Sequence, residues 1–275
     1  MTDKKTHLKV WAPPHLINHA GGLVNTLLEL GYLASLTSEV VYDEDDTSVY
    51  ILYCFWLCNT PKNYIIYQVE NEYRFYSREG YSHVIENAIS IWGYSTKNIK
   101  LFKNYYQDVV HFVPPGLVRR KEGVERDIDV LFYGWWTDRR QRVIDELKRL
   151  GVEVKVIWGR FDPTFGEEMI DILMRTKIVL NIHAEDNSPL ELFRIHEALS
   201  CGCIVMSEVT EELESYPIDY HRYVNFGHLQ GMIANYIKIT LSSYANAYGD
   251  GKLKEFDVSV LDNKYYVQKA MEALC

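Results

Sequence analysis

The chain has 275 residues, of which 47% are hydrophobic and 24% are charged, and its formal net charge is −9 at pH 7. This length suits one large domain or two of ordinary size, and the composition is that of a globular protein with a substantial core. The acidic balance argues against a general nucleic-acid binder, because such a protein needs a surplus of Lys and Arg.

Strands and helices are predicted to alternate through the first half of the chain. A short strand at 8–11 ends at Pro13-Pro14, and leucines recur at helical spacing from Gly21 to Ala34. The continuous apolar run at 49–57 is typical of a strand covered on both faces. Further strands are predicted over 39–42, 63–70, 89–95 and 108–116, and helices over 79–90 and 95–106.

The second half repeats this alternation and predicts the fold class. Strands are predicted over 129–134, 152–159, 177–183, 203–208 and 223–226, and helices over 139–151, 166–175, 189–200, 228–246 and 263–274. Alternation of this kind favours parallel sheets with crossover helices, hence two doubly wound, Rossmann-like α/β units. In such units ligands bind at the carboxyl ends of the strands, and two units facing each other would form a cleft.

A charged stretch at 119–127 is the natural boundary between the two units. We therefore expect a first domain over 1–117 and a second over 118–250. A C-terminal helix within 251–275 is expected to pack back on the first domain.

The cysteines and the N-terminal residues bear on location. Five cysteines without zinc-binding spacing predict free thiols in a reducing compartment. The first ten residues do not resemble a secretory signal, and the apolar run at 51–58 is far shorter than a membrane helix requires. We expect a cytoplasmic protein without a transmembrane segment.

The stretch from 180 to 208 concentrates the polar residues expected of a ligand site. His183 and Ser188 follow the carboxyl end of a strand, and a helix is predicted to begin near Pro189, where proline loses no hydrogen bond. Free backbone N–H groups at that end, such as that of Leu190, would bind phosphate. Arg194 lies one turn further, and its planar guanidinium suits a bidentate phosphate contact.

Two acidic residues flank this arginine. The carboxylates of Glu191 and Glu197 would accept hydrogen bonds from sugar hydroxyls rather than bind phosphate. The stretch therefore predicts a pocket for a diphosphate between two hydroxylated rings, which describes a nucleotide sugar. The alternative is an ordinary surface helix, in which Glu191, Arg194 and Glu197 form ion pairs of little energy.

The run EALSCGCIV at 197–205 resembles the signature of GT-B glycosyltransferases, and its ending is similar to exostosin-like transferases. The resemblance implies that Glu197 holds the ribose hydroxyls of the donor. The common retaining form has a second glutamate eight residues earlier, where this chain has Pro189. We therefore expect Glu191 to contact the donor sugar instead.

The resemblance extends more weakly to the strand, loop and helix at 132–147. It implies that Gly134 and either Arg139 or Arg140 face the donor phosphates, although a solvated helix start is the alternative. Trp158, at the end of the next strand, could lie against the nucleotide base. The alternative, which the sequence favours, is a core tryptophan.

In the first half, the resemblance implies that the loop after the first strand faces the cleft. Gly21 and Gly22 would let the backbone approach the donor phosphates. His15 or His19 could be the general base that accepts the proton of an acceptor hydroxyl, because imidazole titrates near working pH. Glu70, at the end of a later strand, is the rival base.

The acidic run at 43–46 invites a magnesium or manganese site, but it lies in a polar turn without a phosphate-binding helix start. We expect no metal and no cofactor, with backbone dipoles and arginines neutralising the leaving diphosphate instead.

The sequence thus predicts a GT-B glycosyltransferase that moves a sugar from a nucleoside-diphosphate sugar, with UDP favoured, to a hydroxyl of a glycan or other acceptor. One alternative is a two-domain sugar-nucleotide epimerase. Another is a non-catalytic module that binds nucleotides or sugars. A dehydrogenase is disfavoured because no G-x-G-x-x-G motif follows a strand.

Overall fold

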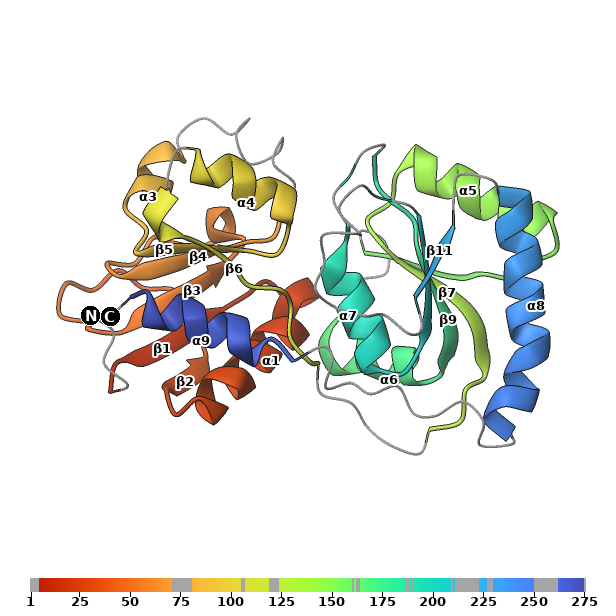
Figure 1. Cartoon of the computed structure of the whole chain (residues 1–275), viewed down its shortest axis with the longest axis horizontal. Coiled ribbons are helices and arrows are strands. Elements are labelled where there is room, and N and C mark those ends of the chain that lie inside the picture. Colours follow the sequence, from red (N-terminus) through yellow and green to blue (C-terminus); the bar gives the residue numbers. More distant parts are fainter. Residues whose placement is uncertain are drawn as a thin grey trace. The chain divides into compact units, whose positions relative to one another are not determined.

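In a computed structural model, the chain forms two compact α/β units (Figure 1). The first unit holds the residues up to 119 and those from 261 onward, and the second holds most of the residues between. The structure describes residues 5–70, 81–104, 107–118, 124–159, 161, 164–185, 188, 190–208, 210, 223–226, 230–249 and 262–274.

The first unit is built on a six-stranded parallel sheet in the order β2-β1-β3-β4-β5-β6. Its strands are β1 (His7–Trp11), β2 (Leu33–Leu36), β3 (Val49–Tyr53), β4 (Tyr64–Gln68), β5 (Ser90–Gly93) and β6 (Val110–Phe112). Its helices are α1 (Ile17–Glu29), α3 (Ser82–Glu86), α4 (Thr96–Lys103) and α9 (Lys264–Glu272), with short 3-10 turns η1 (Pro14–Leu16), η2 (Phe55–Leu57) and η3 (Gln107–Val109).

Helices cover both faces of this sheet, with α3 and α4 on one side and α1 and α9 on the other (Figure 1). Every residue of β3, β4 and β5 is buried, as expected of central parallel strands. Helix α9 is fixed to α1 through Asn263, whose amide accepts from the Thr26 hydroxyl at 3.1 Å and donates to the carbonyl of Pro114 at 3.0 Å.

Three of the helices and strands predicted for this unit differ from the structure. The helix expected from Gly21 to Ala34 begins at Ile17 and ends at Glu29. It stops because Gly31 adopts a φ of +84°, a conformation that glycine readily supplies after a helix. Residues 39–42 form no strand, since β2 lies earlier, and β3 is shortened by Cys54, whose φ of +52° turns the chain into η2.

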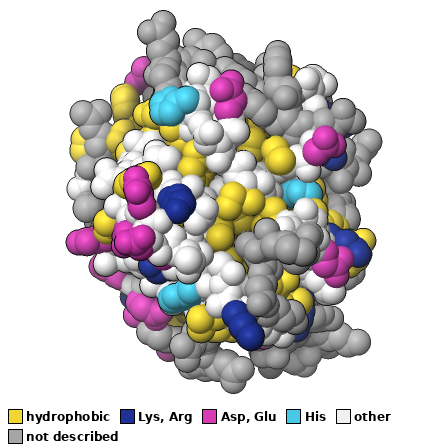
Figure 2. Space-filling view, turned by 90° about the vertical axis from the view of Figure 1, so that its left-hand side faces the viewer, with side chains coloured by type: hydrophobic (Ala, Val, Ile, Leu, Met, Phe, Trp, Pro, Cys, Tyr) yellow, Lys and Arg dark blue, Asp and Glu magenta, His cyan; other side chains and the backbone are white. Residues whose placement is uncertain are grey.

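The helical spacing misled because Leu33 belongs to the edge strand β2, where 53% of its surface stays exposed. Leu28 and Leu36 are also largely exposed, at 48% and 43%. Figure 2 shows one face of the first unit, on which hydrophobic side chains lie among acidic and basic ones. An exposed leucine is therefore no evidence that a segment is helical or that it belongs to the core.

The second unit is built on a five-stranded parallel sheet in the order β11-β10-β9-β7-β8. Its strands are β7 (Ile128–Gly134), β8 (Lys155–Trp158), β9 (Thr176–Asn181), β10 (Ile204–Glu208) and β11 (Tyr223–Phe226). Its helices are α5 (Asp138–Arg149), α6 (Gly166–Met174), α7 (Leu192–Ser200) and α8 (Gln230–Gly249). Helices α5 and α8 pack together on one face, and α6 and α7 lie on the other (Figure 1).

The order of these strands defines where a ligand would bind. From β7 the chain crosses to β8 on one side, and from β8 it returns to β9 on the other side of β7. Helices diverge at such a switch point and leave a crevice outside the carboxyl ends of the strands. The predicted class, two doubly wound α/β units with parallel sheets, is confirmed.

Two further observations concern thiols and membranes. Cys54, Cys58, Cys201 and Cys203 are free thiols. No helix in the described ranges combines the length and the apolar character needed to cross a bilayer.

Candidate functional site

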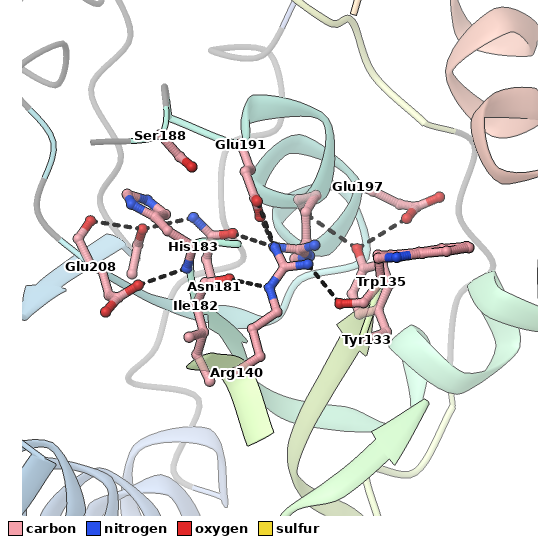
Figure 3. Close-up of polar contacts among 12 residues, drawn as sticks. Tyr133, Trp135, Arg140, Asn181, Ile182, His183, Ser188, Glu191, Glu197 and Glu208 are labelled. Atoms are coloured by element: carbon pink, nitrogen blue, oxygen red, sulfur yellow. Dashed lines mark hydrogen bonds and ion pairs between the residues drawn. The ribbon is translucent and has the colours of Figure 1, made fainter. Parts of the chain in front are cut away.

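The candidate site lies at the carboxyl edge of the second sheet, at its switch point. There β7 ends at Gly134, β9 ends at Asn181 and β10 ends at Glu208. Helices α5 and α7 bring charged side chains to the same edge, and most of these lie within hydrogen-bonding distance of one another (Figure 3).

Arg140, on α5, is 2% exposed and donates to three protein acceptors. Its Nε donates to the carbonyl of Ile182 at 2.8 Å, and its Nη1 donates to the carbonyl of Trp135 at 2.8 Å. Its Nη2 forms an ion pair with Glu191 Oε1 at 2.6 Å. The guanidinium thus ties the ends of β7 and β9 to the start of α7.

Arg194, on α7, meets the other oxygen of the same carboxylate. Its Nη1 also donates to Oδ1 of Asn181 at 2.6 Å, and its guanidinium carbon lies 5.5 Å from the centre of the Phe132 ring. Burial and the charge of Arg140 together lower the pKa of Arg194 to about 9, against the opposing effects of Tyr133 and Glu197. The side chain therefore stays charged at neutral pH.

Arg140, Glu191 and Arg194 form what we call the arginine cluster. Two guanidinium groups share one carboxylate, so this cluster carries a surplus positive charge. Nε of Arg194 is buried and has no hydrogen-bond acceptor within the described part of the chain. A buried cluster of this composition would gain from a further anion.

Gly134 makes room for the arginine cluster. Its φ of +151° is a conformation that residues with a side chain rarely adopt. A Cβ built on it would lie 2.6 Å from Nη2 of Arg194. The glycine therefore allows the guanidinium of Arg194 to approach the end of β7.

Glu197 lies one turn further along α7 and is 6% exposed. It accepts a hydrogen bond from the Tyr133 hydroxyl at 3.0 Å. Burial raises the pKa of the Tyr133 phenol well above its usual value, and the charge of Glu197 raises it further. Trp135, 57% exposed, lies on the same side of the site as these two residues (Figure 3).

Arg139 and Glu208 form a second buried ion pair, which we call the His183 clamp. Two parallel hydrogen bonds join the guanidinium to the carboxylate, at 2.9 and 2.8 Å. Glu208 also accepts from the backbone N–H of His183 at 2.6 Å, and Arg139 donates to the carbonyl of His183 at 3.0 Å. Although burial opposes the effect, Arg139 lowers the pKa of Glu208.

Not every predicted residue of the second unit lies in these networks. Trp158 packs its half-buried ring against Phe132, with centroids 5.2 Å apart. The hydroxyl of Ser188 donates to the carbonyl of Glu185 at 3.0 Å, and Leu190 is fully buried.

Helix α7 begins at Leu192, so its predicted start near Pro189 is wrong. The reason is the backbone of Glu191, whose ψ of 67° lies outside the helical range while its carboxylate reaches the two arginines. Pro189 itself lies outside the described residues. The alternative of an ordinary surface helix is also wrong, because seven of the nine residues of α7 are buried.

The first unit positions the predicted loop residues differently from expectation. His15 lies exposed in η1, whereas His19, Gly21 and Gly22 belong to α1. The prediction of a loop through 15–22 is therefore wrong, since helical structure begins directly after Pro13. His19 is 4% exposed, and a Cβ on Gly22 would lie 2.2 Å from the carbonyl oxygen of Leu117. This glycine serves close packing within the first unit.

Glu70 lies two residues beyond β4, and hydrogen bonds of its own backbone hold it in place. Its N–H donates to Oε1 of Gln68 at 2.9 Å, and its carbonyl accepts from Nδ2 of Asn98 at 3.0 Å. In the acidic turn, Asp46 pairs with Lys9 at 2.8 Å, and this contact holds the pKa of Asp46 far below its usual range. Among the described residues, no three His, Cys, Asp or Glu side chains gather as a metal ion would require.

Sequence reasoning missed three residues of the site. Glu208 ends a strand, Asn181 ends its neighbour, and Tyr133 stands one residue before Gly134. An acid that closes an otherwise apolar strand, as in CIVMSE, is the signal that could have found Glu208. Nothing local distinguishes the other two, because their partners lie 13 and 64 residues away in the sequence.

Comparison with solved structures identifies the class of fold. An α1,3-fucosyltransferase solved with GDP-fucose has a TM-score of 0.54 at 12% identity, over 98% of this chain and 90% of that chain. Sucrose-phosphate synthase from Thermosynechococcus elongatus has a TM-score of 0.56 at 12% identity, over 98% of each chain. A DNA-modifying β-glucosyltransferase, studied with and without uridine diphosphoglucose, has a TM-score of 0.51 at 12% identity, over 98% and 99%. The protein has the GT-B glycosyltransferase fold.

The family comparison concerns the second unit. Residues 139–236 match the family model described as glycosyl transferase-like. The uncharacterized protein L140 of Acanthamoeba polyphaga mimivirus is 27% identical over 108 residues, which is 39% of this chain and 28% of that protein. The chain thus matches less than a third of that relative's length. Both the arginine cluster and the His183 clamp fall within the glycosyl transferase-like region.

Proposed function

We propose that this protein is a glycosyltransferase that moves a sugar from a nucleoside-diphosphate sugar to an acceptor hydroxyl. The observation that carries the proposal is the arginine cluster, a buried site of surplus positive charge at the switch point of a glycosyl transferase-like region. A uridine diphosphate sugar is the first candidate donor, and a glycan is the first candidate acceptor.

The arginine cluster fits the electrostatic demand of this reaction. When the bond between the sugar's anomeric carbon and the diphosphate breaks, negative charge accumulates on the diphosphate. Fixed positive groups in a buried site stabilise that charge without having to reorganise. Arg140 and Arg194 are such groups, and the unpartnered Nε of Arg194 offers a donor that no described residue uses.

The remaining roles are assigned by chemistry. Glu197 accepts from the ribose hydroxyls of the donor, and Glu191 shares the two arginines with the diphosphate. The acceptor hydroxyl loses its proton to a general base as its oxygen bonds to the anomeric carbon. His15, Glu70 and His19 remain candidates for this base, although His19 is as buried as His183, at 4% exposed.

Donor binding tests the proposal directly. A thermal-shift screen of UDP, GDP and ADP with their sugars should show a rise in melting temperature for a matching donor, because a ligand of the native state stabilises it. Release of the nucleoside diphosphate in the presence of an acceptor would separate a transferase from a binding module. The absence of any shift across the screen would contradict the proposal.

Replacing Glu197 by glutamine should lower the affinity for both the nucleoside and the nucleoside diphosphate by roughly 10-fold or more, since a hydrogen bond to a charged group is lost. Glutamine keeps an oxygen for Tyr133, so the fold should survive. Calorimetry measures the affinities. Glu146→Gln, an exposed change on α5, is the control and should leave them unchanged. Equal affinity of Glu197→Gln and wild type for every nucleotide would remove the ribose role.

We also propose that the reaction needs no metal ion, with the arginines supplying the positive charge. Transfer should then continue in excess EDTA at the rate seen without it. The assay follows nucleoside diphosphate release before and after chelation. Complete loss of activity that Mn²⁺ restores would contradict this and direct attention back to the acidic residues.

A further inference from the structure

The backbone of His183 is held at both of its polar groups by one buried ion pair. Glu208 accepts from its N–H at 2.6 Å, and Arg139 donates to its carbonyl at 3.0 Å. The two residues of the His183 clamp are themselves joined by a bidentate contact, with side chains only 19% and 4% exposed. Four hydrogen bonds therefore fix the position of a residue that lies just beyond the end of β9.

The side chain of this tightly held residue has an unused polar atom. His183 is 4% exposed, and its Nε2 is buried without a hydrogen-bond partner among the described residues. In Figure 3 the hydrogen bond drawn to His183 joins its backbone N–H to Glu208, and no dashed line reaches its ring. Burying an imidazole nitrogen without a partner costs free energy, and such an exception calls for an explanation.

The ring is also uncharged at physiological pH. Burial, together with the charges of Arg139, Arg194 and Arg140, lowers the pKa of His183 to about 4 against the opposing effect of Glu208. A neutral imidazole adds no positive charge beside Arg140 and Arg194, the two arginines of the arginine cluster. It does suit a hydroxyl group, which can donate or accept and so matches either tautomer.

We propose that His183 binds a hydroxyl of the donor's sugar through Nε2, and that the His183 clamp is the device that positions it. This inference rests on the proposed function and assigns it a sugar-contacting residue, distinct from the arginines that face the diphosphate. The clamp residues act through His183 and touch no substrate themselves.

The test compares each nucleoside diphosphate with its sugar, using UDP against UDP-glucose and GDP against GDP-fucose. For the pair that wild type binds, His183→Ala should weaken the nucleotide sugar by about 10-fold or more, the effect of one buried hydrogen bond left unpaired. The affinity of this variant for the nucleoside diphosphate should stay within about twofold of the wild-type affinity. His183→Gln should restore part of the loss, because its amide can both donate and accept.

The positioning role is tested by Glu208→Gln, which removes the charge of the His183 clamp while keeping its shape. We expect the same selective loss for the nucleotide sugar and little change for the nucleoside diphosphate. The matched control is Asp127→Asn, which neutralises the carboxylate of the exposed ion pair between Asp127 and Arg175 in the same unit. In that control the ratio of the affinities for the nucleotide sugar and the nucleoside diphosphate should equal the wild-type ratio.

The outcomes separate this inference from the proposed function. If wild type binds neither the nucleoside diphosphate nor the nucleotide sugar of any pair, both the inference and the proposed function are overturned. If wild type binds both members of a pair and His183→Ala loses equal affinity for each, the role of His183 is overturned and the proposed transferase function is not. Should that variant fail to fold, long-range ¹H–¹⁵N spectra of wild type decide: a shift of His183 Nε2 with the nucleotide sugar alone supports the inference, and no shift overturns it.

Discussion

Replacing Arg140 by methionine should lower the free energy of unfolding of the second unit by about 3–5 kcal/mol, the range for removing one partner of a buried ion pair. Methionine keeps much of the apolar stem. It leaves the carbonyls of Ile182 and Trp135 without this donor, and it leaves the carboxylate of Glu191 with Arg194 alone. Hydrogen exchange of amides in β7 and β9 measures the loss, because central strands exchange mainly when their unit opens.

Arg149→Met is the matched control, since it makes the same change on the same helix. Arg149 pairs with Glu146 at 2.6 Å, but the two side chains are 69% and 37% exposed. Water replaces the lost contact there, so exchange in β7 and β9 should not change. If both variants lost protection equally, the burial of Arg140 would not be the source of its effect.

The large loss expected for Arg140→Met does not mean that the arginine cluster stabilises the fold. Taking charges out of water is expensive, and a well-packed apolar group in the same place is often as stable or more so. The cluster instead holds surplus positive charge at the switch point between β7 and β9, where the helices diverge. Proteins tolerate such local costs mainly at functional sites. An anionic ligand would offset the cost by supplying the missing negative charge.

The sequence predicted the second unit well because its signals are local. Each strand there is a short apolar run between a helix end and a polar loop. Helix α5 buries Val143, Ile144 and Leu147 at helical spacing, and Gly151 follows its end. Since the carboxyl ends of parallel strands share one edge, residues such as His183, Arg140 and Arg194 could be expected at one site. The structure brings these three to that edge.

What the sequence could not supply were pairings between distant residues. Arg139 and Glu208 are 69 positions apart, and neither shows which partner it will take. The start of α7 was misjudged for the same reason, since proline at 189 is a local signal while Glu191 is held outside the helix by contacts from other segments. In the first unit, Gly22 looked like a phosphate-binding glycine because its packing partner, Leu117, is also remote in sequence.

Gly22→Ala should destabilise the first unit by about 2 kcal/mol or more. A Cβ there would lie 2.2 Å from the carbonyl oxygen of Leu117, and this contact is with backbone that cannot rotate away. Overpacking of this kind costs ~1–3 kcal/mol and occasionally more, which exceeds the gain of ~1 kcal/mol from placing alanine in a helix. Hydrogen exchange of amides in β1 and α1 measures the change.

Gly21→Ala provides the control in the neighbouring position of α1. Nothing lies within 4 Å of a Cβ built on Gly21, so this variant should be more stable than wild type by about 0.5–1 kcal/mol. Because the helix-propensity gain is common to both changes, the difference between the two variants isolates the contact with Leu117. Two variants of equal stability would show that the segment around Leu117 moves aside freely, and that Gly22 has a reason other than packing.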